Sequence, residues 1–151
     1  MKDNQISQAG EPASAPAQGR TNPPRRILLV DDDRDVRQLN AGVLVRAGYR
    51  VDTAEDGAAG WRALNANRYD LLITDNTMPG VTGLELIKKL RSEDMTLSVI
   101  LASGTAPTEE LYRYPWLELD ATLPKPYSID ELLGAVKEVL RAAGNAREPI
   151  G

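Results

Sequence analysis

Short runs of apolar residues alternate along the chain with longer stretches in which apolar residues recur at every third or fourth position. The run at residues 71–73 has no polar alternation, which is typical of a strand that is covered on both faces inside a parallel sheet. The segments that we predict to be strands are residues 27–30, 50–54, 71–75, 98–103 and 121–123. The pattern therefore indicates a chain that alternates between strand and helix.

The helical stretches begin and end at residues that suit helix termini. Thr82 and Glu85, and again Ser128 and Glu131, have the spacing of a capping box, and Gly48 ends the first helical stretch. We predict helices from the acidic run 31–33 as far as Gly48, and over residues 57–67, 82–90, 108–114 and 128–143. Five strands that alternate with five helices through short connections predict a doubly wound parallel sheet with helices on both faces.

The two ends of the chain differ in composition from the part between them. Residues 1–24 are rich in Gln, Ser, Ala, Gly and Pro, and Ile6 is their only branched aliphatic residue. Such a segment cannot bury enough apolar surface to offset the entropy of ordering. We therefore expect a disordered tail over residues 1–24, one domain over residues 25–143 and a flexible tail over residues 144–151.

The composition excludes several kinds of chemistry. The chain has no cysteine and no histidine, so a bound metal would have oxygen ligands, which favours Mg²⁺, Ca²⁺ or Mn²⁺. The net charge of −4 is opposite to the basic surface that binds nucleic acid. No run approaches the length of a membrane span, and the N-terminus lacks the apolar core of a signal peptide. We expect a cytoplasmic protein that contacts neither nucleic acid nor membrane directly.

Polar side chains follow the predicted strands at their carboxyl ends. In chain order they are Asp31, Asp32, Asp75, Ser103 and Lys125. The carboxyl ends of parallel strands meet at one edge of the sheet, where open α/β folds bind their ligands. Taken singly, each residue has a plainer interpretation as a helix cap, a turn residue or a solvated charge. We assign the capping role to Asp33, and we interpret the convergence of the other residues as a site.

Three carboxylates that lie close together repel one another, so a cation is expected among them. Oxygen ligands without histidine point to Mg²⁺, which keeps coordination positions open for phosphate oxygens. A phosphoryl group beside Asp75 would meet the ammonium of Lys125 and the hydroxyl of Ser103. Asp75 is then placed to attack phosphorus as a carboxylate nucleophile.

From residue 26 to residue 143 the sequence resembles the receiver domain of two-component response regulators. The matching features are the acidic run after the first strand, Asp75, Met78-Pro79-Gly80, Ser103 and Lys125-Pro126. The resemblance implies a flavodoxin-like sheet with strand order 2-1-3-4-5. It also implies that Asp75 accepts a phosphoryl group from a sensor histidine kinase or a histidine phosphotransfer protein, and that the phosphorylated form acts on a downstream protein.

The same resemblance implies roles for individual residues. The ligands of Mg²⁺ would be Asp32, Asp75 and the backbone carbonyl of Thr77, with Asp31 contributing through water. Ser103 would bind the phosphoryl group and relay its presence, and Lys125 would pair with it. The Lys125–Pro126 peptide bond would be cis.

Two features depart from the family pattern. Thr122 stands three residues before the lysine, where receivers usually carry Tyr or Phe, so the usual aromatic readout is missing. The helix predicted over residues 108–114 is short, and Pro115-Trp116 follows it. We expect Trp116 to pack beneath this loop, because exposed tryptophan is uncommon outside interfaces.

The sequence thus predicts a single-domain receiver that transfers phosphoryl only to, and hydrolyses it only from, its own Asp75. Three alternatives stay open. A phosphatase of the haloacid-dehalogenase type also uses an aspartyl nucleophile, but it needs a second acid at the position of Thr77. A binding module that works without phosphorylation is disfavoured by the intact Asp32, Asp75 and Lys125. A receiver excised from a larger hybrid kinase is compatible with the linker-like composition of residues 11–20.

Overall fold

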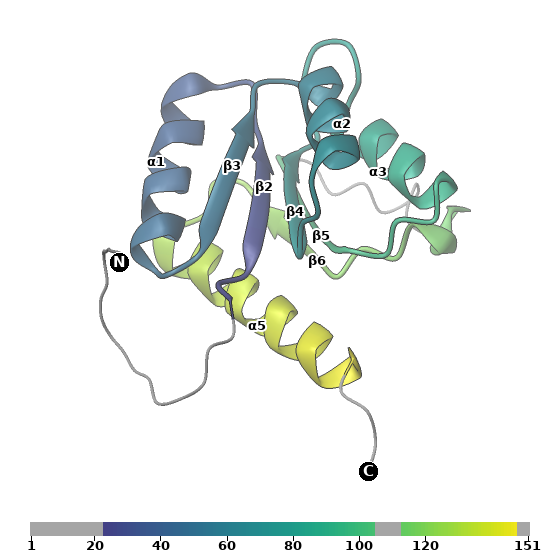
Figure 1. The fold of residues 1–151 in the computed structure, drawn as a ribbon. Helices are drawn as coiled ribbons and strands as arrows, with labels where there is room; N and C mark the ends of the chain where they lie inside the picture. Colours follow the sequence, from purple (N-terminus) through teal and green to yellow (C-terminus); the bar gives the residue numbers. More distant parts are fainter. Residues whose placement is uncertain (1–22, 105–112, 148–151) are drawn as a thin grey trace, which may run out of the picture.

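A five-stranded parallel sheet forms the centre of the computed structural model, which describes residues 23–104 and 113–147 (Figure 1). In chain order the strands are β2 (Arg26–Val30), β3 (Arg50–Ala54), β4 (Leu71–Asp75), β5 (Ser98–Ser103) and β6 (Ala121–Pro124). They lie side by side in the order β3-β2-β4-β5-β6. Counted in chain order this is 2-1-3-4-5, so the predicted fold and strand order are confirmed.

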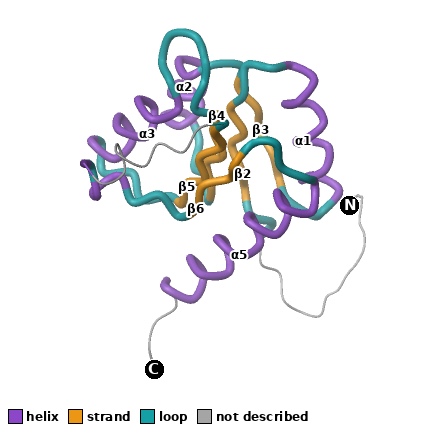
Figure 2. Tube along the Cα trace, turned by 180° about the vertical axis from the view of Figure 1, so that it is seen from behind, coloured by secondary structure: helices purple, strands orange, loops and turns teal. Residues whose placement is uncertain are grey.

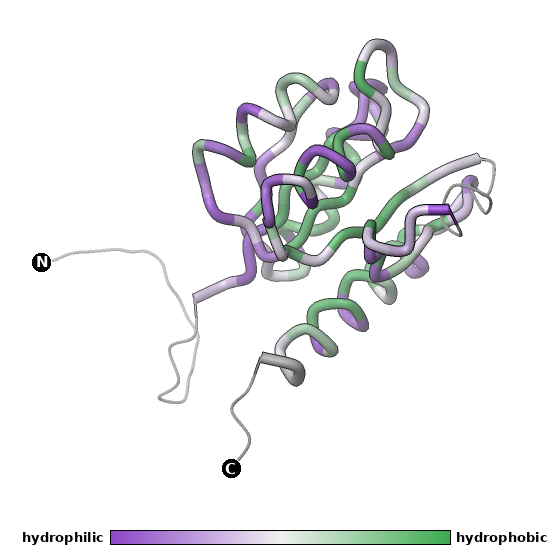
Figure 3. Tube along the Cα trace, turned by 90° about the vertical axis from the view of Figure 1, so that its right-hand side faces the viewer, coloured by the Kyte–Doolittle hydropathy of each residue, from purple (hydrophilic) through white to green (hydrophobic). Residues whose placement is uncertain are grey.

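The central strands are apolar on both faces because helices cover both faces. In β2, Leu28 and Val30 pack into one core cluster, and Ile27 and Leu29 pack into the other. The hydrophobic colour in Figure 3 accordingly follows the strands through the middle of the molecule. The uninterrupted apolar runs in the sequence have this origin.

In the described part of the chain, two pairs of helices cover the sheet, one pair on each face (Figure 2). The first core cluster takes its helical residues from α2 (Gly57–Ala66) and α3 (Gly83–Ser92). The second takes them from α1 (Arg34–Arg46) and α5 (Ile129–Arg147). A three-residue 3₁₀ turn, η1 (Pro115–Leu117), precedes β6 and lies against α3.

The starts of α1, α3 and α5 and the end of α1 lie where local sequence chemistry predicts. The side chain of Asp33 accepts hydrogen bonds from the backbone N–H groups of Asp35 and Val36 at the start of α1. The capping box of Thr82 and Glu85 is formed at the start of α3. Ser128 and Glu131 form the same two hydrogen bonds at the start of α5. Gly48 follows α1 with φ of 103°, a left-handed conformation that glycine adopts without strain.

One prediction about the later part of the chain needs correction, and another is not tested. The last helix continues to Arg147, past the predicted end at Ala143, because a glycine inside a helix costs only about 1 kcal/mol. A Cβ atom on Gly144 would lie 2.9 Å from Nη2 of Arg25, so the missing side chain lets α5 approach that guanidinium. The short helix predicted over residues 108–114 falls mostly outside the described residues.

Trp116 is 47% exposed, so the prediction that it packs beneath the loop is wrong. A single 3₁₀ turn has three residues per turn and can direct only one of them inward. Leu117 is that residue, with 1% exposure, while the ring of Trp116 stands edge-on to Tyr114 at a centroid distance of 6.2 Å. Among the helices of residues 23–104 and 113–147, none is long and apolar enough to cross a bilayer.

Candidate functional site

Three carboxylates meet at the carboxyl edge of the sheet. Asp31 follows β2 and Asp75 ends β4, and these neighbouring strands are paired in parallel up to Val30 and Thr74. One oxygen atom each from Asp31, Asp32 and Asp75 can be chosen so that all three lie within 4.8 Å of one another. Asp31 and Asp75 are buried and Asp32 is exposed. The parallel pairing of β2 and β4 therefore brings Asp31 and Asp75 together, although more than forty residues separate them in the sequence.

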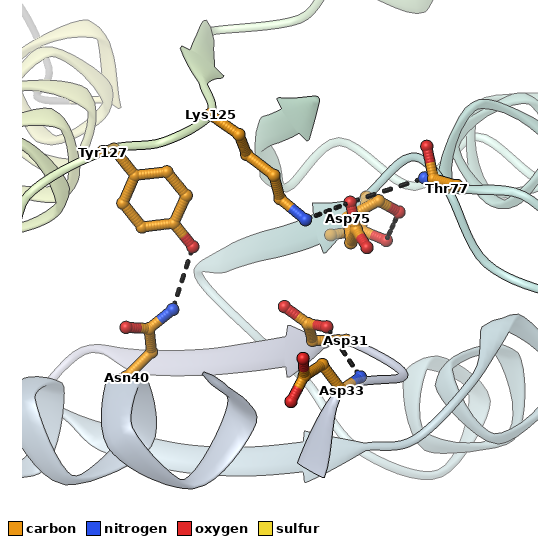
Figure 4. A network of polar contacts seen from close by, with 8 residues as sticks. Asp31, Asp33, Asn40, Asp75, Thr77, Lys125 and Tyr127 are labelled. Atoms are coloured by element: carbon orange, nitrogen blue, oxygen red, sulfur yellow. Dashed lines mark hydrogen bonds and ion pairs between the residues drawn. The ribbon is translucent and has the colours of Figure 1, made fainter. Parts of the chain in front are cut away.

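The carboxylate of Asp31 is held in an environment that resists negative charge. Burial raises its pKa, and the charges of Asp75 and Asp32 add to this rise. The backbone N–H of Asp33, which donates to Oδ1 of Asp31 at 2.9 Å, and the charge of Lys125 oppose it, but the net pKa is raised (Figure 4). A cation placed among the three acids would relieve this repulsion.

Lys125 already supplies one positive charge to the cluster. Its Nζ atom lies 2.9 Å from Oδ1 of Asp75, and Figure 4 shows the side chain reaching from the end of β6 toward β4. Burial lowers the pKa of Lys125, but the hydrogen bond to Asp75 and the charges of Asp75 and Asp31 outweigh it, so the pKa is raised. The side chain therefore remains an ammonium group beside the buried carboxylate.

The structure also places the other two predicted site residues at this edge. The backbone N–H of Thr77 donates to Oδ1 of Asp75 at 3.4 Å. Ser103 ends β5 and is buried, and its carbonyl accepts from the backbone N–H of Lys125 at 2.9 Å. β5 pairs with β4 one residue before this point, where Ala102 is opposite Asp75. All the predicted site residues thus lie at or just after the ends of β2, β4, β5 and β6, which are neighbours in the sheet. The Lys125–Pro126 peptide bond is cis, as predicted.

The donor set suits a hard divalent cation. Three carboxylates and backbone carbonyls offer only oxygen, and one carboxylate, Asp32, is exposed, so the cluster has access to solvent. Mg²⁺ prefers such ligands and binds few of them, which leaves positions for water or phosphate oxygens. The residues present therefore fit Mg²⁺.

A family model of the response regulator receiver domain matches residues 27–137. The chain belongs to the response regulator receiver family. Receivers bind Mg²⁺ through acidic residues, and the cluster of Asp31, Asp32 and Asp75 fits this property.

Individual relatives agree with the family assignment. The chain is 33% identical over 124 residues to the transcriptional regulatory protein TctD of Salmonella typhimurium, covering 82% of this chain and 55% of TctD. It is 36% identical over 118 residues to the response regulator MprA of a Mycobacterium species, covering 78% of this chain and 51% of MprA. The chain thus spans about half the length of these curated relatives.

Among solved structures, the fold is similar to the response regulator TrrA of Thermotoga maritima in complex with Mg(2+)-BeF. The TM-score is 0.68 and the sequence identity 32%, over 76% of this chain and 98% of that one.

Sequence reasoning missed a polar pair beside the receiver site. The side-chain amide of Asn40 in α1 donates to the hydroxyl of Tyr127 at 2.9 Å, and Figure 4 shows this hydroxyl on the same side of the loop as Lys125. Burial raises the pKa of Tyr127, and the charges of Asp31 and Asp75 add to the rise. A signal was present in the sequence: Asn40 interrupts the apolar stripe of α1, and a buried polar side chain requires a partner.

Proposed function

We propose that this receiver is the phosphoacceptor of a two-component phosphorelay, in which Asp75 takes a phosphoryl group from a phosphohistidine. The observation that carries the proposal is the position of Asp75. Its carboxylate is 5% exposed, lies within the acidic cluster and has the ammonium of Lys125 at 2.9 Å. A buried carboxylate between a cation site and a lysine is suited to accept a phosphoryl group and to neutralise its charge.

In the transfer step, a carboxylate oxygen of Asp75 attacks phosphorus. The O–P bond forms as the N–P bond of the phosphohistidine breaks, and the electron pair of that bond returns to the imidazole, which is then protonated. Lys125 offsets the negative charge of the phosphoryl oxygens, and the hydroxyl of Ser103 donates a hydrogen bond to one of them.

Mg²⁺, when bound, would supply positive charge to the phosphoryl oxygens. We assign its binding to the carboxylates of Asp32 and Asp75 and the backbone carbonyl of Thr77, with Asp31 acting through water. The closeness of the three carboxylates, whose oxygens lie within 4.8 Å of one another, supports a shared ion, and the division of roles is the one that the resemblance to receivers implies.

The proposed partners are a sensor histidine kinase or a histidine phosphotransfer protein as donor, and a downstream protein that distinguishes the phosphorylated form. The donor follows from the membership of the receiver family. The relatives TctD and MprA carry the names of regulators, but this chain covers only about half of each. We place the output of residues 25–143 in protein contacts, since the chain is acidic overall.

The test is the intact mass of the protein after exposure to phosphoramidate, which carries a transferable P–N bond, with and without MgCl₂. The wild type should gain one phosphoryl group only with Mg²⁺, and Asp75→Asn should gain none. Asp32→Asn should lose most of the labelling, whereas Asp33→Asn should label like the wild type because Asp33 caps α1 and Asn caps equally well. Labelling of Asp75→Asn at the wild-type rate would overturn the assignment.

A further inference from the structure

Asn76, the residue after Asp75, is bonded to two different elements at once. Its backbone N–H donates to the carbonyl of Ala102 at 2.8 Å, which continues the pairing of β4 with β5 beyond the end of β4. Its backbone carbonyl accepts from the N–H of Gly83 at 3.1 Å, and its side-chain Oδ1 accepts from the N–H of Leu84 at 3.1 Å. Gly83 and Leu84 are the first two residues of α3. Asn76 therefore joins the end of the phosphoacceptor strand to the start of α3.

The start of α3 would be capped by Thr82 even without this contact. The first backbone N–H groups of a helix have no partner inside the helix. The hydroxyl of Thr82 accepts from the third of them, on Glu85, at 3.2 Å. Asn76 takes the first and the second, from eight positions upstream of Leu84. The side chain of Asn76 therefore does more than cap α3. It also ties the two ends of the loop of residues 77–82, which contains Thr77, to each other.

The peptide unit between Asn76 and Thr77 is held at both of its ends. Its carbonyl oxygen accepts from Gly83, and its N–H donates to Oδ1 of Asp75 at 3.4 Å. These two bonds fix the plane of the peptide and hence the direction in which the chain leaves toward the carbonyl of Thr77. They also orient the carboxylate of Asp75.

Gly83 permits this arrangement because it has no side chain. A Cβ atom at this position would lie 2.4 Å from the backbone oxygen of Asp75 and 2.9 Å from Cα of Asn76. Real Cβ atoms do not approach other heavy atoms this closely, and both neighbours here are backbone that cannot move aside cheaply. The first turn of α3 thus packs directly on the backbone of Asp75 and Asn76.

We propose that Asn76 is a positioning residue of the cation site: through its bond to Leu84 it holds the loop so that the Thr77 carbonyl and the Asp75 carboxylate face the ion together. The proposal rests on the function proposed above, in which these two groups bind Mg²⁺. When the loop samples other arrangements, the apparent affinity for the ion falls by the fraction of molecules in the competent one. Removing the side chain of Asn76 should therefore weaken ion binding without touching a ligand.

The experiment compares two variants that each lose a hydrogen bond at the same helix end. MgCl₂ is titrated into the full chain, the dissociation constant is measured from amide NMR shifts, and the melting temperature is measured in parallel. Asn76→Ala should raise the dissociation constant roughly threefold to tenfold, because losing the hydrogen bond that holds the loop lowers the fraction of molecules in the competent arrangement. Both variants should lower the melting temperature by a similar amount, because each removes one hydrogen bond from the start of α3. In Thr82→Ala, however, the dissociation constant should stay within about twofold of the wild type. The NMR spectra also report whether each variant is folded.

Two results would overturn the inference. If Asn76→Ala binds Mg²⁺ as the wild type does, Asn76 does not position the site. If Thr82→Ala weakens binding as much as Asn76→Ala, the effect comes from a less stable α3 and not from Asn76. Failure of the wild type itself to bind Mg²⁺ would be a different outcome, because it would refute the proposed function on which the inference rests.

Discussion

The ammonium of Lys125 and the backbone N–H of Thr77 share one oxygen, Oδ1 of Asp75, at 2.9 Å and 3.4 Å. The lysine therefore compensates part of the negative charge of the cluster when no other cation is there. An ion that binds among Asp31, Asp32 and Asp75 must do so in the field of this ammonium. Lys125 and the ion would therefore compete for the carboxylate of Asp75. Once Asp75 is phosphorylated, the lysine can pair with the phosphoryl oxygens instead.

The first prediction follows from this competition. Lys125→Ala should bind Mg²⁺ more tightly than the wild type, by roughly twofold to fivefold, because a partly exposed ion pair is worth up to about 1 kcal/mol. In EDTA the variant should melt at a lower temperature than the wild type, since the acids lose their compensating charge. MgCl₂ should raise its melting temperature by more than it raises that of the wild type.

Lys125→Arg is the matched control, because it keeps the charge and should leave Mg²⁺ affinity close to the wild type. Weaker Mg²⁺ binding by Lys125→Ala, as large as the loss in Asp32→Ala, would show that the lysine supports the ion and does not compete with it.

The second prediction concerns the buried pair of Asn40 and Tyr127. Tyr127→Phe removes the acceptor of the Asn40 amide, which is 4% exposed, and leaves that donor without its partner. The cost should be about 1–3 kcal/mol in the free energy of unfolding. Urea unfolding measures it directly.

The double variant Asn40→Leu with Tyr127→Phe should recover part of this loss, because it removes both polar groups and leaves apolar contact. A double-mutant cycle gives the coupling energy of the pair. Strict additivity of the two single changes would contradict a direct hydrogen bond in solution.

The strands, the capped starts of the helices and the strand-end site were accessible from the sequence because each depends on near neighbours or on a simple rule. The capping box of Thr82 and Glu85 spans three residues, and parallel strands bring their carboxyl ends to one edge. The bond from Asn40 to Tyr127 spans 87 positions, and nothing local to either residue specifies its partner. The sequence around Asn76 likewise does not reveal its acceptor role, because that role depends on where α3 starts in space.

The third prediction is a pH dependence at the opposite edge of the sheet. The hydroxyl of Tyr69 donates to Oδ2 of Asp52 at 2.6 Å, and Arg26 donates to the same oxygen at 2.8 Å. Burial and the bond to Asp52 raise the pKa of Tyr69 to about 12. The bond from Tyr69, helped by Arg26 and opposed by burial, lowers the pKa of Asp52 below its usual value.

The direction in which stability changes with pH depends on whether the folded or the unfolded state holds the proton. Between pH 10 and pH 12 the unfolded chain loses the proton of Tyr69 while the folded chain keeps it, so stability should fall as the pH rises through this window. Asp52 contributes stability above its unfolded pKa of 3.8, and this contribution is lost as the pH falls below that value. Tyrosinate absorbance should show one group with a midpoint near 12 that disappears in Tyr69→Phe. An unchanged pH profile of unfolding in Tyr69→Phe would refute this role for the pair.

The fourth prediction concerns Arg91, which joins α3 to the end of η1 and to the residue after it. Its guanidinium donates to four backbone carbonyls at 2.8–3.0 Å, which belong to Met95, Leu97, Leu117 and Glu118. Burial lowers the pKa of Arg91, and the charges of Asp120 and Glu118 oppose this. A lysine carries the same charge but cannot present the planar set of donors that four acceptors require.

Arg91→Lys should therefore lower the free energy of unfolding by about 1.5–3 kcal/mol, measured by urea denaturation. Lys89→Ala is the control on the same helix: its ammonium lies 4.9 Å from the centre of the Trp61 ring at the surface, and its loss should cost less than about 1 kcal/mol. Equal losses in the two variants would show that the carbonyl contacts of Arg91 carry no particular weight.

The exposure of Trp116 could not be read from the sequence, because it depends on which residue of η1 faces the core. Apolar character alone favoured burial, and Leu117 next to it took the inward position. The ring instead stands against Tyr114, over which Nζ of Lys88 lies at 4.2 Å. This surface position makes Trp116 a sensitive reporter of changes near η1.

The last prediction uses this reporter to find how phosphorylation is read out. Residue 122, on β6, is an exposed threonine. Because it carries no aromatic ring, no ring at this position can move between a buried and an exposed orientation. Ser103 is buried at the site and can contact the phosphoryl group in one state and not in the other, and a switch requires such a difference in contact. We expect beryllofluoride with Mg²⁺ to change the iodide quenching of Trp116, and Trp61→Phe to leave the change in place. Ser103→Ala should remove it while intact mass still shows phosphorylation of Asp75 by phosphoramidate, and a full quenching change in Ser103→Ala would show that the coupling runs through another part of the site.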